Sequence, residues 1–201
     1  MTRRRAWPAV AAALVLLLSG CGGESDSAAQ PKASEKSSTP KVAYFVKDDT
    51  DAINLATATA IEAGKTAVDK KNIAACNQAS SKGYPAWRAC WHALLDPLKS
   101  SLAGVQAELA TLAKKENRPE ACATELDAAA RTFGGFATKV DGLTDGIDSD
   151  KRADQLKTGK TYDTTIRRIG DGYAKPFQAL TKVCYSPSDL EKIQASPTPS
   201  R

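Results

Sequence analysis

Apolar residues recur at alternating intervals of three and four positions through the middle of this chain, and this spacing is the strongest constraint on its fold. The longest run consists of Trp91, Leu95, Leu98, Leu102, Val105, Leu109 and Leu112. Because an α-helix has about 3.6 residues per turn, every member of the run lies on one face. The run therefore predicts a helix from about Trp87 to Lys115 that packs along a continuous seam.

Two later segments repeat the same period. Arg118-Pro119 separates them from the first, because the residue before a proline avoids the helical conformation. The second stripe consists of Cys122, Leu126, Ala129, Phe133, Phe136, Val140, Leu143 and Ile147. The third consists of Tyr162, Ile166, Ile169, Tyr173, Phe177, Leu180 and Cys184. Pro176 falls within the third stripe, so we expect a kink there.

A fainter helical pattern precedes these three segments. Thr39-Pro40 provides a capping residue followed by a proline suited to the first helical position. Beyond it, one face carries mostly small side chains, at Ile53, Thr57, Ala60, Gly64 and Ala67. Four amphipathic segments with short connections predict an all-α domain that folds as an antiparallel up-down four-helix bundle.

Four cysteines, Cys76, Cys90, Cys122 and Cys184, are predicted to form two disulfides. The helix expected after Cys76 would span about 40 Å, whereas the Cα atoms of a disulfide lie within about 7 Å of each other. In up-down order, Cys76 and Cys90 lie at one end of the bundle, and Cys122 and Cys184 lie at the other. The pairing that avoids spanning the bundle is Cys76 with Cys90 and Cys122 with Cys184.

The first 21 residues have the organisation of an export signal. Arg3-Arg4-Arg5 is followed by an apolar run from Ala6 to Leu18 and then by Leu18-Ser19-Gly20-Cys21. The apolar run is too short to cross a bilayer, because a membrane span needs about 20 apolar residues. The segment therefore predicts a cleaved leader.

This leader resembles the signal of bacterial lipoproteins, whose lipobox ends in a cysteine placed like Cys21. The resemblance implies that residues 1–20 are a removed signal peptide and that Cys21 carries diacylglycerol and fatty acyl chains such as palmitate. Because two acyl chains anchor stably, the protein would be lipid-anchored at the extracytoplasmic face of the cell membrane. The alternative is a secreted protein with Cys21 unmodified. The alanine-rich composition also resembles exported lipoproteins of high-GC actinobacteria.

Composition divides the rest of the chain into three parts. Residues 21–39 are small, polar and charged, and they predict a disordered tether with a reach of about 21–25 Å. Residues 40–185 hold the predicted bundle domain. Residues 186–201 contain Pro187, Pro197 and Pro199 among polar residues, which predicts a disordered tail.

Neither composition nor motifs favour an enzyme, a cofactor, a metal or a nucleic-acid partner. His92 is the only histidine, so di-iron motifs and zinc sites are incomplete, and we expect a partly buried helix residue. The acidic run at residues 141–150 lacks the EF-hand register and predicts a polar hairpin in which Asp148, Ser149 or Asp150 caps the next helix. Without the three leader arginines, Lys and Arg fall from 28 to 25 against 23 acidic residues, a near balance that gives little support for nucleic-acid binding.

Tyr84, Trp87 and Trp91 cluster near the start of the long helix. They predict either a binding patch, since aromatic residues are enriched at interaction hot spots, or a plug at one end of the core. We expect a non-enzymatic domain that binds an envelope protein or glycan. The alternative is a carrier of a small apolar ligand, which would need an enclosed apolar cavity within the bundle.

Overall fold

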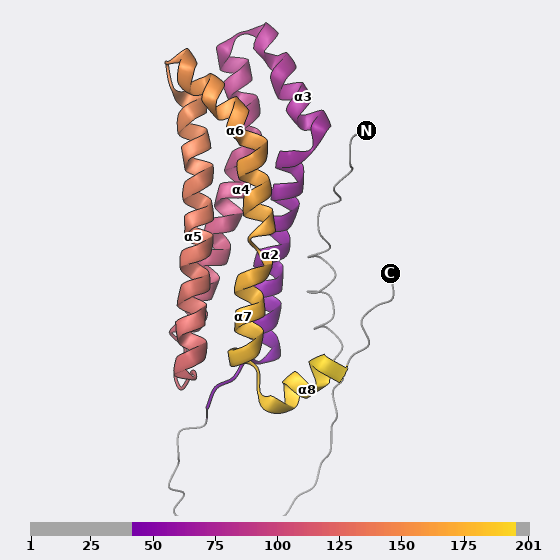
Figure 1. Cartoon of the computed structure of the whole chain (residues 1–201), viewed down its shortest axis with the longest axis vertical. Helices are drawn as coiled ribbons and strands as arrows, with labels where there is room; N and C mark the ends of the chain where they lie inside the picture. Colours follow the sequence, from indigo (N-terminus) through magenta and orange to yellow (C-terminus); the bar gives the residue numbers. More distant parts are fainter. Residues whose placement is uncertain (1–41, 196–201) are drawn as a thin grey trace, which may run out of the picture.

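The computed structural model describes residues 42–195 of this chain of 201 residues. The predicted signal peptide, Cys21 and the tether lie outside the described residues, as do residues 196–201. Between residues 42 and 195 the structure is a helical bundle without strands, as the sequence predicted (Figure 1). No helix of this part is both long and apolar enough to cross a membrane.

Long helices of alternating direction lie side by side along one axis. In chain order the elements are α2 (Lys47–Val68), α3 (Lys70–Ala79), the 3-10 turn η2 (Ser80–Lys82), α4 (Tyr84–Ala113), α5 (Glu120–Asp148), α6 (Arg152–Asp171), α7 (Ala174–Cys184) and α8 (Pro187–Ala195). In Figure 1, α2 and α3 run upward, α4 downward, α5 upward, and α6 with α7 downward, while α8 lies across the lower end. α4 packs against α2 and α5, and α5 also packs against α6 and α7.

The predicted apolar stripes form the core of this bundle. On α4, every member of the stripe from Trp91 to Leu112 is buried, and on α5 the same holds from Cys122 to Ile147. The mostly small face of α2 is also buried, and Ala60 and Ala67 are fully enclosed. Small side chains let the backbone of α2 approach its neighbours closely. The apolar period of the sequence therefore determines which face of each helix is turned toward the core.

Two disulfides close opposite ends of the bundle and confirm the predicted pairing. Cys76 on α3 is bonded to Cys90 on α4, with 5.2 Å between their Cα atoms. Cys122 near the start of α5 is bonded to Cys184 at the end of α7, with 4.8 Å between their Cα atoms. Most of the length of α4 separates the two bonds.

The last helical segment is divided into α6 and α7 upstream of Pro176. The sequence predicted only a kink at that proline. α6 ends at Asp171 and α7 begins at Ala174. A proline cannot bond the carbonyl four residues earlier, and its ring collides with that carbonyl. For Pro176 this residue is Gly172, which lies in the break. Gly172 also lies against Phe136, because a Cβ there would be 2.5 Å from Cζ of that ring.

The chain reaches α2 through an extended segment, residues 42–46. The predicted helix start at Thr39-Pro40 lies outside the described residues. α2 begins only at Lys47. Two backbone hydrogen bonds hold the segment: the N–H of Ala43 donates to the carbonyl of Asn117 at 2.9 Å, and the N–H of Phe45 donates to that of Cys184 at 2.8 Å. The chain therefore joins the bundle at the end that carries the Cys122–Cys184 disulfide.

Residues 187–195 form α8, where the sequence predicted a disordered tail. The hydroxyl of Ser186 accepts the N–H of Asp189 at 3.2 Å and donates to its carboxylate at 2.6 Å. Pro187 occupies the first helical position, where its missing N–H costs nothing. A good cap has therefore started a short helix in a polar segment that lacks an apolar stripe.

Candidate functional site

Four aromatic side chains contact one another in series, from the surface into the core, at the end of the bundle that carries Cys76–Cys90. Tyr84 and Trp87 on α4 stack with ring centroids 5.7 Å apart and planes inclined by 27°. Trp87 meets Trp91 edge-on at 6.4 Å, and Trp91 meets Tyr162 of α6 at 4.7 Å. Tyr84 is 38% exposed and Trp87 is partly buried, whereas Trp91 is only 6% exposed. Of the three aromatic residues predicted as a patch, Tyr84 and Trp87 reach the surface, and Trp91 belongs to the core.

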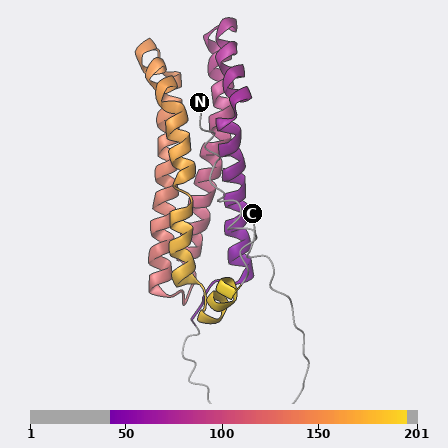
Figure 2. The same ribbon diagram turned by 45° about the vertical axis from the view of Figure 1, so that its right-hand side comes forward.

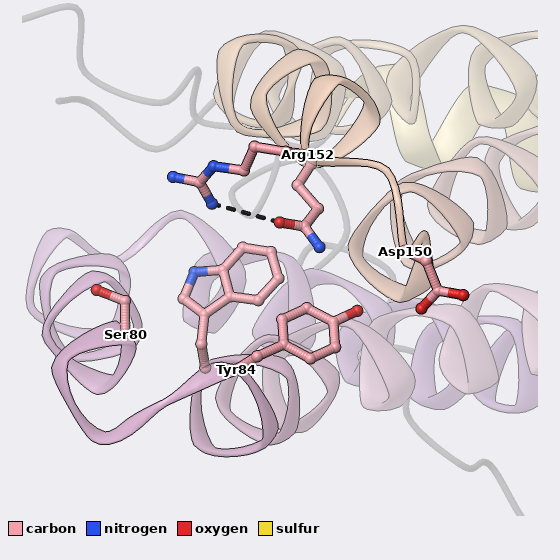
Figure 3. Close-up of a pocket in the computed structure, with 6 residues that line it drawn as sticks. Ser80, Tyr84, Asp150 and Arg152 are labelled. Atoms are coloured by element: carbon pink, nitrogen blue, oxygen red, sulfur yellow. Dashed lines mark hydrogen bonds between the residues drawn. The ribbon is translucent and has the colours of Figure 1, made fainter.

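Tyr84 and Trp87 line a cleft of about 380 Å³, which we call the tip cleft. Its other lining residues are Ser80, Asp150, Arg152 and Gln155. Figure 3 shows Ser80 and Tyr84 on one side and Arg152 on the other. In Figure 2 the α3–α4 and α5–α6 ends of the bundle stand apart at the top of the view. The residues that line the tip cleft come from η2 and the start of α4 and from the α5–α6 connection and the start of α6, which are distant in sequence.

The polar wall of the tip cleft is held by the connection between α5 and α6. α5 continues through the acidic run to Asp148, so the predicted polar hairpin shrinks to residues 149–151. The Nε2 amide of Gln155 donates to the carbonyl of Ser149 at 2.8 Å. The guanidinium of Arg152 donates to Oε1 of Gln155 at 3.3 Å (Figure 3). These bonds link the side chains of Arg152 and Gln155 to each other and to the backbone of the connection.

The predicted cap of α6 differs from the observed one. Lys151 is the residue that precedes the helix, and it makes no side-chain cap bond, so none of Asp148, Ser149 and Asp150 is the capping residue. Ser149 Oγ lies two residues too early, where it accepts the N–H of Lys151 at 3.1 Å and donates to Asp154 at 2.8 Å. The longer course of α5 has taken up the residues that the sequence assigned to the hairpin.

A stripe on α4 ties the end of α5 to the base of the tip cleft. The hydroxyl of Tyr84 donates to the carbonyl of Ile147 at 2.7 Å. Arg88 pairs with the carboxylate of Asp148, and Nε2 of His92 lies 2.8 Å from the same carboxylate. Residues 84, 88 and 92 share a face because they are four positions apart. We call Arg88, His92 and Asp148 the clasp.

Electrostatic interactions within the clasp favour its charged form, with His92 protonated and Asp148 ionised. The hydrogen bond to Asp148 raises the pKa of His92, partial burial opposes this, and a contact with Asp96 at 3.2 Å adds to it. The hydrogen bond from Arg88 lowers the pKa of Asp148, and His92 acts in the same direction. Each charge therefore favours the other, so His92 serves as an ion-pair partner between α4 and α5.

Further clefts lie elsewhere on the described part of the bundle. One, at the α2–α3 junction, is lined by Lys65, Val68, Asp69, Lys70, Lys71 and Arg167, of which Lys65 and Arg167 are paired with Glu62 and Asp163. Another follows the α5–α6 hairpin between Gly142 and Thr161. In the part of the chain that the structure describes, no three His, Cys, Asp or Glu side chains converge as a metal site.

Sequence reasoning found the aromatic side of the tip cleft but missed its polar side and the clasp. Gln155 and Arg152 lie more than 60 positions from Trp87, so no local pattern relates them. The spacing of Tyr84, Arg88 and His92 was the only local signal, and it does not name a partner. Comparisons with protein families, with curated proteins and with solved structures found no match. Function therefore has to be inferred from the chain itself.

Proposed function

We propose that this protein is a lipid-anchored extracytoplasmic domain that binds a component of the cell envelope, protein or glycan, through the tip cleft. The observation that carries the proposal is the open cleft in which Tyr84 and Trp87 lie beside Arg152 and Gln155. Aromatic residues and arginine are enriched at binding hot spots because they combine large contact areas with directed polar groups.

The cysteines support an extracytoplasmic location. Disulfides persist in oxidising compartments and are rare in the cytosol. The two disulfides use four of the five cysteines of the chain. Cys21 is the remaining one, and it is the residue at which the lipoprotein-like leader ends. Its thiol is thus left for the lipid.

The bundle separates the tip cleft from the proposed anchor. Residues 42–46 join the bundle beside Cys122–Cys184, whereas the tip cleft lies near Cys76–Cys90 at the opposite end. α4 connects the two ends with 30 residues, which corresponds to about 45 Å of helix. The cleft is therefore held away from the attachment point, as suits a partner outside the bilayer.

The anchor is tested by membrane fractionation and intact mass of the full chain and of its Cys21→Ala variant. We expect the wild type in the membrane fraction with the mass of a lipidated, cleaved protein, and the variant in the soluble fraction. Cys21→Ser serves as a second variant that preserves polarity. Wild-type protein that is soluble and unmodified at Cys21 would contradict this part of the proposal.

Binding at the tip cleft is tested by co-sedimentation with isolated envelopes of the producing cells. The full chain carrying Cys21→Ala removes the lipid contribution, and Arg152→Ala is added to test the cleft. Arg167→Ala is the matched control, because it removes the same charge from the same helix outside the tip cleft. We expect Arg152→Ala to reduce sedimentation at least fivefold and Arg167→Ala to leave it unchanged. Equal sedimentation of all three proteins would contradict binding at this cleft.

The carrier alternative has less support from the observed packing. Large side chains such as Phe133, Leu95 and Leu98 are fully buried between the helices. The tip cleft and the cleft at the α2–α3 junction are instead lined largely by polar and charged residues at the surface. This arrangement favours a surface partner over an enclosed apolar ligand.

A further inference from the structure

We infer that the tip cleft takes a neutral pyranose unit of a glycan, an inference that rests on this cleft being the binding site proposed above. The chemistry of the six lining side chains carries it: two aromatic rings, one hydroxyl, one carboxylate, one guanidinium and one carboxamide.

The aromatic side of the cleft suits the apolar face of a sugar ring. Tyr84 and Trp87 stack on one another within one helical turn, and both residues line the cleft. The faces of aromatic rings carry negative partial charge, and the C–H bonds on one face of a pyranose carry the complementary weak positive charge. The hydrogen bond from Tyr84 to the carbonyl of Ile147 and the contact between Trp87 and Trp91 hold both rings in place before any ligand arrives.

The polar side suits adjacent hydroxyl groups. Arg152 supplies donors in a planar fork, and Gln155 supplies one donor and one acceptor in a second plane. Asp150 adds an acceptor, and Ser80 adds a hydroxyl from the opposite hairpin. Neighbouring hydroxyls of a sugar both donate and accept, so a mixed set of this kind satisfies them better than a set of cations alone.

The charge and the volume of the tip cleft restrict the class of ligand further. Asp150 and Arg152 carry opposite charges, so the tip cleft has no excess of cations for a phosphate or sulfate. The cleft at the α2–α3 junction, with Lys65, Lys70 and Lys71, has that excess instead. A volume of about 380 Å³ lies near the lower end of small-ligand pockets, which is suited to one or two sugar rings.

A peptide fits the tip cleft less well than a sugar. Peptides are recognised through an exposed strand edge or through apolar grooves for aliphatic anchors. Residues 42–195 contain no strand, and none of the six lining side chains is aliphatic. A protein partner is therefore the competing outcome of the test and not the inference.

The experiment titrates the full chain with neutral trisaccharides, namely maltotriose, cellotriose, mannotriose and tri-N-acetylchitotriose. Binding is followed by tryptophan fluorescence and by saturation transfer from protein to sugar protons in NMR. We expect at least one trisaccharide to bind, with strong transfer to ring C–H protons. Trp87→Ala and Arg152→Ala should each weaken binding at least tenfold, and Trp87→Phe should retain part of it. Arg167→Ala is the matched control, and circular dichroism checks that each variant is folded.

The outcomes separate this inference from the proposed function. Failure of all four trisaccharides to bind, or unchanged binding by Arg152→Ala, would overturn the sugar assignment. If envelope sedimentation still depends on Arg152 but is abolished by protease treatment of the envelopes, the partner is a protein and only the present inference fails. If sedimentation survives protease treatment but is lost after glycan removal, the inference is supported.

Discussion

Asp49 is a carboxylate enclosed at the base of the bundle, where the chain passes from the extended segment into α2. Its side chain and that of Arg118 are each only 2% exposed, and they pair at 3.1 Å, while Lys115 pairs from the outer side. Burial raises the pKa of Asp49, but hydrogen bonds from Lys115, the N–H of Val46 and Arg118 outweigh it, so the pKa lies below its ordinary value.

Replacing Asp49 should be costly because it leaves Arg118 buried without its partner. We expect Asp49→Ala to lower the free energy of unfolding by about 3–5 kcal/mol. Asp51→Ala is the control, since its pair with Lys47 is exposed and contributes at most about 1 kcal/mol. Chemical denaturation of the three proteins measures both values. Similar losses for the two variants would show that the pair at the base is not effectively buried.

Gly146 on α5 marks a close approach of α6. A Cβ at this position would lie 1.9 Å from Oγ1 and 3.1 Å from Cβ of Thr158, whereas a Cβ at Gly142 would have no neighbour within 4 Å. We expect Gly146→Ala to destabilise the protein by about 1–3 kcal/mol through overpacking. Gly142→Ala should stabilise it by up to about 1 kcal/mol, because alanine favours the helix. Thermal denaturation of both variants and the wild type measures these changes in stability. A stabilised Gly146→Ala variant would contradict the close approach of α6 to Gly146.

At the scale of elements, the clasp couples the start of α4 to the end of α5 and makes this contact sensitive to pH. Because the pKa of His92 is raised in the folded state, the stabilisation is complete below its ordinary value of about 6.5. It is lost as the pH rises through the folded-state value. The free energy of unfolding should therefore decrease as the pH rises from about 6.5 into the weakly alkaline range.

The His92→Gln variant should remove this dependence, while Arg88→Gln should lower stability with most of the slope retained, since arginine does not titrate in this range. Denaturant midpoints measured at intervals across the range give the slope for each protein. An unchanged slope in His92→Gln would assign the dependence to another group. Because Asp148 precedes the connection that carries Arg152 and Gln155, loosening the clasp should also weaken binding at the tip cleft.

For the whole molecule, the two disulfides restrain loops of very different length. The sequence separation is 14 residues for Cys76–Cys90 and 62 residues for Cys122–Cys184. The loop-entropy model assigns them about 3 and about 4 kcal/mol. We expect the double variant Cys122→Ala, Cys184→Ala to lose more thermal stability than Cys76→Ala, Cys90→Ala. Both should remain helical by circular dichroism, since the apolar seams do not depend on covalent closure, and the reverse ranking would contradict the loop-length argument.

The helices could be predicted because their apolar period is a local signal. The disulfides could be predicted because four cysteines allow few pairings. A stripe such as Leu95 to Leu112 buries itself only if the segment is helical, so the period reveals both the element and its inner face. The pairing of four cysteines allows three choices, and the length of one helix removes two of them. The break before Pro176 was misplaced because the clash falls four residues upstream of the proline itself. α8 was missed because a cap at Ser186, without an apolar stripe, started it.

The sequence by itself determined the helical class, the buried faces and the disulfide pairing. The apolar period identifies each helix and its buried face, and the length of one helix decides which cysteines can pair. Only the tertiary structure decided that His92 meets Asp148, that Asp49 meets Arg118, and that Gln155 and Trp87 line the same cleft. Each of these pairs brings together residues more than 50 positions apart in the sequence. Such pairs depend on how far packed helices are shifted along one another and how far apart they lie. No periodic pattern of polar residues in the sequence reveals these two quantities.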